Sequence, residues 1–284
     1  MNCAHALTIA GLLSWGAPLA PLGAAEAPAA PAANPTPLVR AHSHNDYEHK
    51  RPLLDALDHG FCSVEADVFL VETNLLVAHV RLFASPERTL QKLYLDPLRE
   101  RARQNGGRIF PGGPSGWLFI DLKTDADATY NRLHEILAGY PDLITRFEGE
   151  RVITNAVTVV ISGNRPRALM TAQKVRYATL DGRSPDLDAP AATNLIHVAS
   201  DQWGKFFKWR GVGTMPEAEL AQLKAMVAKA HAKGYKLRLW AAPDTTAAWQ
   251  TQYDAGVDLI NTDNHAGMRE FLMGKLAAPA VMRP

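Results

Sequence analysis

The chain is predicted to fold as an α/β protein, a single-domain (β/α)8 barrel of the TIM type. From Leu38 onward, short apolar runs alternate with longer helical patterns, and several of the helical patterns are followed by a glycine. Eight such alternations in about 240 residues match the usual length of this barrel. An open doubly wound sheet is the alternative, but no glycine-rich phosphate loop follows the first apolar run.

The strand candidates are short apolar runs bounded by turn residues. They are Leu38–His42, Ser63–Val68, Trp117–Leu122, Val157–Ser162, Arg176–Leu180, Asn194–Ala199, Lys236–Ala241 and Asp258–Thr262. A further run from Leu75 to His79 is predicted as a small extra strand over the barrel mouth.

The helix candidates carry apolar residues at a spacing of three and four. They are Pro52–His59, Leu90–Gln104, Asp127–Ala138, Pro216–Lys233 and Thr245–Ala255. Gly60, Gly234 and Gly256 stand where three of these helices should end.

The amino-terminal segment is typical of a secretory signal. Residues 1–25 contain no Lys, Arg, Asp or Glu, and their apolar run leads into Gly23-Ala24-Ala25. Gly16 and two prolines interrupt the run, which disfavours a transmembrane anchor. We expect residues 1–25 to be a signal peptide, 26–37 an Ala/Pro linker, 38–276 the folded domain and 277–284 a tail. The protein is therefore expected to be exported, to the periplasm or the extracellular space.

Composition excludes one class of partner. Thirty basic residues against 29 acidic ones provide no bulk field that would attract nucleic acid. Removal of the signal peptide would leave a single cysteine, Cys62, so no disulfide is expected. The sequence does not indicate an oligomeric state.

Three carboxylates are predicted to hold a metal ion. Glu65 and Asp67 share one face of their strand, because side chains alternate with period two. Two acids about 7 Å apart repel each other unless a cation lies between them. Asp121 ends the next strand, and barrel active sites form at the carboxyl ends of strands. Such an oxygen-rich site suits one divalent cation, Mg²⁺ or Ca²⁺.

Two histidines are predicted to transfer protons. His44 follows the first strand and His79 follows the run that starts at Leu75. Because imidazole titrates near pH 6.5, one ring can take a proton from an attacking hydroxyl and the other can give one to the leaving oxygen. Asn45, Lys123 and Trp240 are the candidates for substrate contact. The predicted activity is a metal-dependent phosphodiesterase.

Each of these residues also has a structural explanation. His79 could be an ordinary loop histidine, Lys123 could pair with Asp121, and Trp240 could pack inside the barrel. Asp263 is expected to cap the final turn, and Arg81 and Arg88 are expected to be solvated. An apolar strand interior rarely holds two acids without a partner, so the combination favours a site.

The segment 203–210 interleaves aromatic and basic residues after the sixth strand. Such a loop could make a transient contact with a membrane surface. Alternatively its aromatic side chains fold inward over the barrel mouth, and this second interpretation is favoured.

Several motifs resemble the glycerophosphodiester phosphodiesterase and phosphatidylinositol-specific phospholipase C superfamily. They are the segments 41–47 (AHSHNDY), 63–68 (SVEADV), 76–79 (LVAH), 119–123 (FIDLK) and 258–263 (DLINTD). The likeness is greatest to the branch that includes altered inheritance of mitochondria protein 6. The resemblance implies a TIM-type barrel, two catalytic histidines and a divalent ion, with a substrate of the glycerophosphodiester or phospholipid-headgroup type. It also implies that the substrate's own hydroxyl attacks, giving a cyclic phosphate before or instead of hydrolysis.

The resemblance also assigns roles to individual positions. His44 and His79 match the histidine pair, and Glu65, Asp67 and Asp121 match the three acidic ligands. Typical glycerophosphodiesterases read His-Arg-Gly and then Pro-Glu-Asn-Thr, where this chain has His-Asn-Asp at 44–46 and Arg-Pro-Leu-Leu at 51–54. The likeness therefore supports phosphodiester chemistry more than a glycerophosphodiester substrate.

Two other functions remain open at this stage. A zinc-dependent hydrolase of the amidohydrolase or polymerase-and-histidinol-phosphatase type would use the His-x-His pair His42 and His44. Such a site needs more histidines at later strand ends, where only His197 and His265 are available. A non-catalytic barrel that only binds is the second possibility, and the complete set of histidines and acids argues against it.

Overall fold

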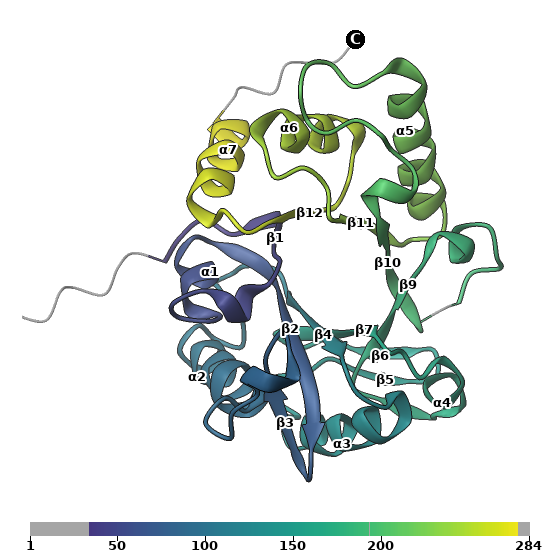
Figure 1. The fold of residues 1–284 in the computed structure, drawn as a ribbon. Helices are drawn as coiled ribbons and strands as arrows, with labels where there is room; N and C mark the ends of the chain where they lie inside the picture. Colours follow the sequence, from purple (N-terminus) through teal and green to yellow (C-terminus); the bar gives the residue numbers. More distant parts are fainter. Residues whose placement is uncertain (1–33, 193, 278–284) are drawn as a thin grey trace, which may run out of the picture. The chain divides into compact units, whose positions relative to one another are not determined.

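Eight parallel strands form a closed barrel in the computed structural model, which describes residues 34–192 and 194–277 (Figure 1). They are β1 (Leu38–Ser43), β2 (Phe61–Val71), β4 (Gly116–Leu122), β7 (Val157–Gly163), β9 (Thr179–Gly182), β10 (Ile196–Gln202), β11 (Lys236–Trp240) and β12 (Leu259–Thr262). Each strand pairs with the next of the eight, and β12 pairs with β1 to close the ring. The predicted barrel is confirmed. The predicted signal peptide, residues 26–33 of the linker and the tail beyond residue 277 lie outside the described residues.

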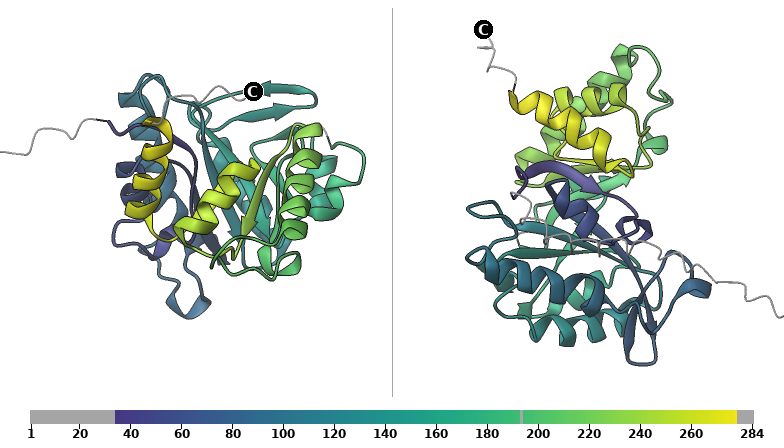
Figure 2. Two further views of the ribbon diagram at one scale, coloured as in Figure 1. Left: turned by 90° about the horizontal axis from the view of Figure 1, so that it is seen from above. Right: turned by 90° about the vertical axis from the view of Figure 1, so that its left-hand side faces the viewer.

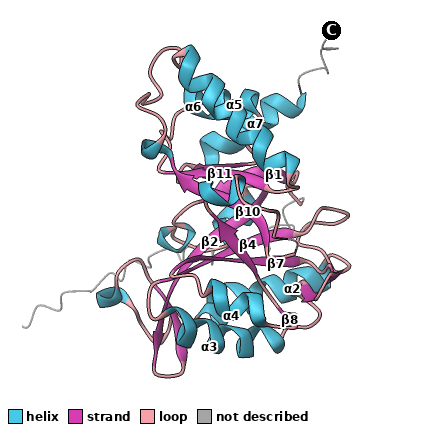
Figure 3. Cartoon of the chain, turned by 90° about the vertical axis from the view of Figure 1, so that its right-hand side faces the viewer, coloured by secondary structure: helices cyan, strands magenta, loops and turns pink. Residues whose placement is uncertain are grey.

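Helices cover the outside of the barrel. They are α1 (Leu54–Asp58), α2 (Asp96–Gln104), α3 (Ala126–Ala138), α4 (Arg167–Ala172), α5 (Glu217–Ala232), α6 (Thr246–Ala255) and α7 (His265–Ala277). Figure 3 shows α5, α6 and α7 on one side of the ring and α2, α3 and α4 on the other. The helices α4 and α7 were not among the predicted ones.

The predicted helix over residues 90–104 is divided. A π-helical segment, η3 (Gln91–Leu95), precedes α2, which begins at Asp96 with Pro97 in its first turn. Proline is tolerated there because the first backbone N–H groups of a helix have no partner within it. The α-helix α2 therefore begins at Asp96, although the apolar pattern continues unbroken from the π-helical segment.

Short strands account for the other differences. The predicted extra strand exists as β3 (Asn74–Val77), but it lies antiparallel along the end of β2 rather than over the mouth. A small second sheet was not predicted; its strands are β5 (Arg146–Glu148), β6 (Arg151–Ile153) and β8 (Val175–Arg176). Strands of two or three residues are too short to display a period of two. The predicted strand 176–180 is accordingly divided between β8 and β9.

The barrel interior contains an apolar layer. Phe119, Val160, Val198 and Leu259 form a buried cluster, with Trp117 packed against it. The His42 ring meets the Phe119 ring edge-on at 4.9 Å between centroids. Filled layers of this kind are usual in small barrels. The layer provides an apolar floor for the polar side chains farther along the same strands.

The aromatic segment 203–210 folds inward, as favoured from the sequence. Trp203, Phe207 and Trp209 are buried, and the Trp203 indole donates to the Trp209 carbonyl at 3.1 Å. These rings are therefore not available for a lipid surface. Among the described residues, none of the helices has both the length and the apolar character needed to cross a membrane.

Asp46 connects the segment after β1 to two later elements. Its buried carboxylate accepts hydrogen bonds from the Ser43 hydroxyl and the Tyr94 hydroxyl, each at 2.8 Å, and from the Leu53 backbone N–H at 2.5 Å. Three donors would thus lose their acceptor if this side chain were removed.

We predict that Asp46→Ala lowers the free energy of unfolding by about 3 kcal/mol, because it leaves buried donors without partners. Urea unfolding followed by circular dichroism measures this change. Tyr94→Phe is the control and should cost only about 1 kcal/mol, since it removes one donor and keeps the ring. Equal effects of the two substitutions would contradict this role for Asp46.

Candidate active site

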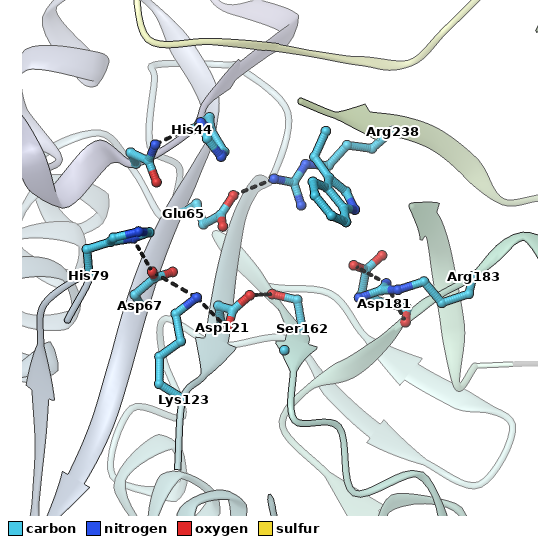
Figure 4. Close-up of a pocket in the computed structure, with 13 residues that line it drawn as sticks. His44, Glu65, Asp67, His79, Asp121, Lys123, Ser162, Asp181, Arg183 and Arg238 are labelled. Atoms are coloured by element: carbon cyan, nitrogen blue, oxygen red, sulfur yellow. Dashed lines mark hydrogen bonds and ion pairs between the residues drawn. The ribbon is translucent and has the colours of Figure 1, made fainter. Parts of the chain in front are cut away.

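A cavity of about 320 Å³ opens at the carboxyl ends of the strands (Figure 4). Its walls include all eight residues singled out from the sequence: His44, Asn45, Glu65, Asp67, His79, Asp121, Lys123 and Trp240. Five further residues also contribute: Ser162, Gly163, Asp181, Arg183 and Arg238. The structure thus brings the predicted residues together, while their individual roles stay predictions.

The three acids converge because of strand register. Asp67 on β2 lies directly opposite Asp121 on β4, and Glu65 precedes Asp67 by two residues on the same face. One carboxylate oxygen from each of the three lies within 4.8 Å of the others. This arrangement places three negative charges at one point of the cavity wall.

Lys123 partly balances these charges. Its ammonium lies 3.0 Å from Asp67 Oδ2 and 3.0 Å from Asp121 Oδ1. Burial alone would lower the pKa of Lys123, but the charges of the two aspartates outweigh it and raise the pKa. At Gly163 a Cβ atom would lie only 2.1 Å from Asp121 Oδ1, so the missing side chain leaves room for the carboxylate.

Glu65 is held by two basic side chains. The Arg238 guanidinium and the His42 Nε2, at 3.2 Å, both contact its Oε2 atom. Burial would raise the pKa of Glu65, but the Arg238 charge and the His42 hydrogen bond hold it well below its usual range. Because Oε2 is occupied in this way, Oε1 is the oxygen left for a ligand.

His42 lies behind Glu65 rather than on the cavity wall. The ring is fully buried, and its Nδ1 is 2.7 Å from the Ser63 hydroxyl. Burial and the nearby Arg238 charge lower the pKa of His42 to about 3, so the ring is neutral near pH 7. His42 is therefore a support for Glu65, which disfavours the zinc site based on His42 and His44.

The additional histidines that a zinc hydrolase would need are also elsewhere. His265 contacts the Ser43 hydroxyl at 2.7 Å and stacks on His49 at 3.8 Å between centroids. His197 packs edge-on against Phe147. Neither ring is part of the cavity wall.

Asp67 has an oxygen that is unpartnered within the described part of the chain and that an ion would fit. Its Oδ2 is 2.7 Å from the Tyr47 hydroxyl, whereas its Oδ1 is buried and has no hydrogen-bond partner among the described residues. Burial, followed by the charge of Glu65, raises the pKa of Asp67 to about 6. A buried carboxylate oxygen without a partner is costly, and a divalent cation would satisfy it. The all-oxygen donor set suits Mg²⁺ or Ca²⁺.

Both cavity histidines use Nδ1 for a structural contact. His44 Nδ1 lies 3.0 Å from Asp263 Oδ1, and His79 Nδ1 lies 2.9 Å from the Tyr47 hydroxyl and 3.2 Å from Asp67 Oδ2. The expectation that Asp263 caps a turn is therefore wrong, because its carboxylate reaches the ring of His44. In each ring Nε2 is the nitrogen left for proton transfer.

Sequence reasoning missed several residues of the cavity. Arg238 lies inside an apolar strand and has the same parity as Trp240, so it points inward with it. Arg183 donates from Nη1 to Asp181 Oδ2 at 2.6 Å, and both residues come from the end of β9. Arg238 could have been predicted, because a charged residue inside an apolar strand is unusual. For Asp181 and Arg183 the sequence offers only their spacing of two residues, which places both side chains on the same face.

The Asp263 carboxylate should control the titration of His44. Burial lowers the pKa of His44, but the Asp263 hydrogen bond and the Glu65 charge outweigh it, so the pKa lies above the usual value. We predict that Asp263→Asn lowers the pKa of His44, because the amide keeps the shape but removes the charge. Proton NMR titration of the His44 ring measures this shift.

The raised pKa of His44 also makes the stability of the folded protein depend on pH. Since the pKa of His44 is raised by folding, its protonation stabilises the native state below about pH 6.5 and this contribution is lost as the pH rises through the native pKa. Asp263→Asn should weaken that dependence. An unchanged pKa in the variant would show that Asp263 does not act on His44.

The chain is similar in sequence and in fold to known proteins. A family model described as the AIM6-like phosphodiesterase domain matches residues 33–181. Altered inheritance of mitochondria protein 6 from Eremothecium gossypii is 32% identical over 270 residues, covering 82% of this chain and 69% of that protein. The protein of the same name from Saccharomyces cerevisiae is 33% identical over 282 residues, covering 81% and 69%. A crystal structure of glycerophosphodiester phosphodiesterase from Agrobacterium tumefaciens has the same fold, with a TM-score of 0.52, 14% identity, and coverage of 84% of this chain and 100% of that one.

Proposed function

Since the chain belongs to the AIM6-like phosphodiesterase domain family, we propose that it is a metal-dependent phosphodiesterase using His44 and His79 as general acid and base. The observation that carries the proposal is the convergence of three carboxylates and two imidazoles on one cavity. The proposed substrate is a phosphodiester of the glycerophosphodiester or phospholipid-headgroup type. The signal-like residues 1–25 support action outside the cytoplasm, in the periplasm or beyond.

Glu65, Asp67 and Asp121 would hold the divalent cation, Mg²⁺ or Ca²⁺. A cation bound there would neutralise charge on the phosphate oxygens. Lys123 and Arg238 line the same cavity and add two fixed positive charges. Asn45 and Trp240 form other parts of the wall and are proposed to contact the substrate. With the cation bound, the cavity would therefore favour a negatively charged group.

The two histidines divide the proton transfers. His44 faces Asp263, which favours its protonated form, and it is therefore the proposed general acid. The attacking hydroxyl gives its proton to Nε2 of His79 while its oxygen bonds to phosphorus. At the same time Nε2 of His44 gives a proton to the oxygen whose bond to phosphorus breaks. A hydroxyl of the substrate or a water molecule can fill the attacking position.

We predict that Glu65→Ala abolishes binding of Mg²⁺ or Ca²⁺, because it removes one of three converging ligands. Isothermal titration calorimetry on the metal-free protein measures this loss. His42→Ala is the comparison and should weaken binding by only about ten- to a hundredfold, since His42 contacts Glu65 from behind and is not itself a ligand. Loss of tight zinc binding in His42→Ala would instead favour the zinc hydrolase.

We predict that His44→Ala and His79→Ala each reduce kcat by about a hundredfold or more, the usual contribution of a positioned acid or base. Hydrolysis should be measured on phosphodiesters with choline, inositol, glycerol and nitrophenyl leaving groups in the presence of Mg²⁺ or Ca²⁺. Binding of the metal should persist in both variants, which separates proton transfer from loss of the ion. Parent-level activity of both variants on every active substrate would disprove the mechanism.

A further inference from the structure

An exposed apolar segment directly follows one of the proposed catalytic histidines. Residues 80–84, here called the rim loop, include a single 3-10 turn, η2 (Arg81–Phe83). Leu82 is 87% exposed, Phe83 is 68% exposed and Val80 is 47% exposed. Single exposed apolar residues are ordinary, but three within four positions form a patch that calls for a partner.

The rim loop projects from the barrel at the same end as the cavity. Figure 2 shows the blue segment that follows β3 extending beyond the strands, away from the small sheet of β5 and β6 at the other end. Because His79 lines the cavity and Val80 is the next residue, the rim loop begins at the edge of the cavity. A surface that contacts the rim loop would also face the opening of the cavity.

The base of the rim loop is tied to the site. The Val77 N–H donates to the Arg88 carbonyl at 2.7 Å, and the Ala78 N–H donates to the Asp67 carbonyl at 3.2 Å. The Arg88 guanidinium donates to the Tyr47 carbonyl at 2.7 Å and to the Val77 carbonyl at 3.3 Å. Arg88 is thus not simply solvated, as the sequence had suggested. These bonds hold the loop in a fixed position relative to His79, Tyr47 and Asp67.

Charge in the rim loop favours an anionic surface. The exposed side chain of Arg81 lies between the apolar residues Val80 and Leu82. The nearby acid, Glu87, is paired with Lys92 at 2.8 Å, so it does not offset Arg81. Apolar side chains beside a cation match the boundary between lipid headgroups and acyl chains.

We propose that the rim loop inserts Leu82 and Phe83 into the surface of an anionic lipid bilayer and so presents the cavity to phosphodiesters held in that bilayer. This inference rests on the proposed phosphodiesterase function. It narrows the substrate class to a phospholipid in place, rather than a headgroup phosphodiester free in solution. It also transfers the suggested membrane contact from the segment 203–210, where Trp203, Phe207 and Trp209 are buried, to residues 80–84.

The test compares the double variant Leu82→Ser/Phe83→Ser with the parent chain. Vesicles of phosphatidylcholine and phosphatidylserine in equal amounts, and vesicles of phosphatidylcholine alone, are mixed with the protein and sedimented. We expect the parent to bind the anionic vesicles and the double variant to bind at least about tenfold more weakly, because two large apolar side chains no longer enter the lipid. Arg81→Glu should reduce binding to the anionic vesicles only.

Leu276→Ser is the matched control. Leu276 is 59% exposed and lies at the end of α7, which runs away from the carboxyl ends of the strands, so this variant should bind as the parent does. Hydrolysis of a soluble nitrophenyl phosphodiester should be unchanged in the double variant, and thermal melting checks that the variant is folded. Equal vesicle binding by parent and double variant would overturn the proposal.

Two outcomes distinguish this proposal from the proposed phosphodiesterase activity and from a dimer contact through the same loop. If no variant hydrolyses any phosphodiester but vesicle binding still depends on Leu82 and Phe83, the proposed activity fails and the membrane contact stands. If sedimentation velocity shows that the parent is a dimer and the double variant is a monomer, with equal vesicle binding, the loop joins two copies of the chain and the lipid proposal is wrong.

Discussion

Three carboxylates, two of them buried and the third partly buried, lie side by side at one end of the barrel and impose the main constraint on this structure. Removing such charges from water is costly unless each is paired, and their mutual repulsion adds to the cost. Arg238 and His42 offset Glu65, while Lys123 is shared by Asp67 and Asp121. These partners come from β1, β11 and the segment after β4, so the compensation exists only when the barrel is closed. The Asp67 oxygen that has no partner among the described residues is the place where the proposed cation would complete this compensation.

The apolar layer beneath the site explains why these interactions are strong. The Arg238 guanidinium lies 4.8 Å from the centre of the Phe119 ring, and the His42 ring meets the same residue edge-on. With aromatic carbon on one side and carboxylate on the other, the arginine has little freedom to move away from Glu65. Phe119 and Asp121 lie two residues apart on β4, so one strand provides both the floor and a proposed metal ligand. Every second side chain of the strand points into the barrel, so Phe119 contributes to the apolar layer and Asp121 to the charged layer above it.

Catalytic geometry depends on the segments that follow the strands. Tyr47, in the segment after β1, contacts Asn45, Asp67 and His79, and so links one proposed catalytic ring to a proposed metal ligand. Asp263 follows β12 and orients His44 from the opposite side of the seam that closes the barrel. Both rings are fixed through Nδ1, which leaves the same nitrogen, Nε2, for chemistry in each. Membership of a phosphodiesterase family agrees with a site that combines oxygen ligands and two oriented imidazoles.

The sequence by itself determined the barrel, most of its strands and eight of the residues that share the cavity, because these follow from local periodicity and from the rule that barrel sites form where strands end. It located Glu65, Asp67 and Asp121 because charges inside apolar runs stand out. Only the tertiary structure decided that Arg238 pairs with Glu65, 173 positions away, and that Asp263 faces His44, 219 positions away. Such pairs depend on which strands become neighbours at closure and on which rotamers then fit, and no local pattern encodes either. The same reason explains why His42, two residues from His44, supports the site from behind instead of facing the cavity.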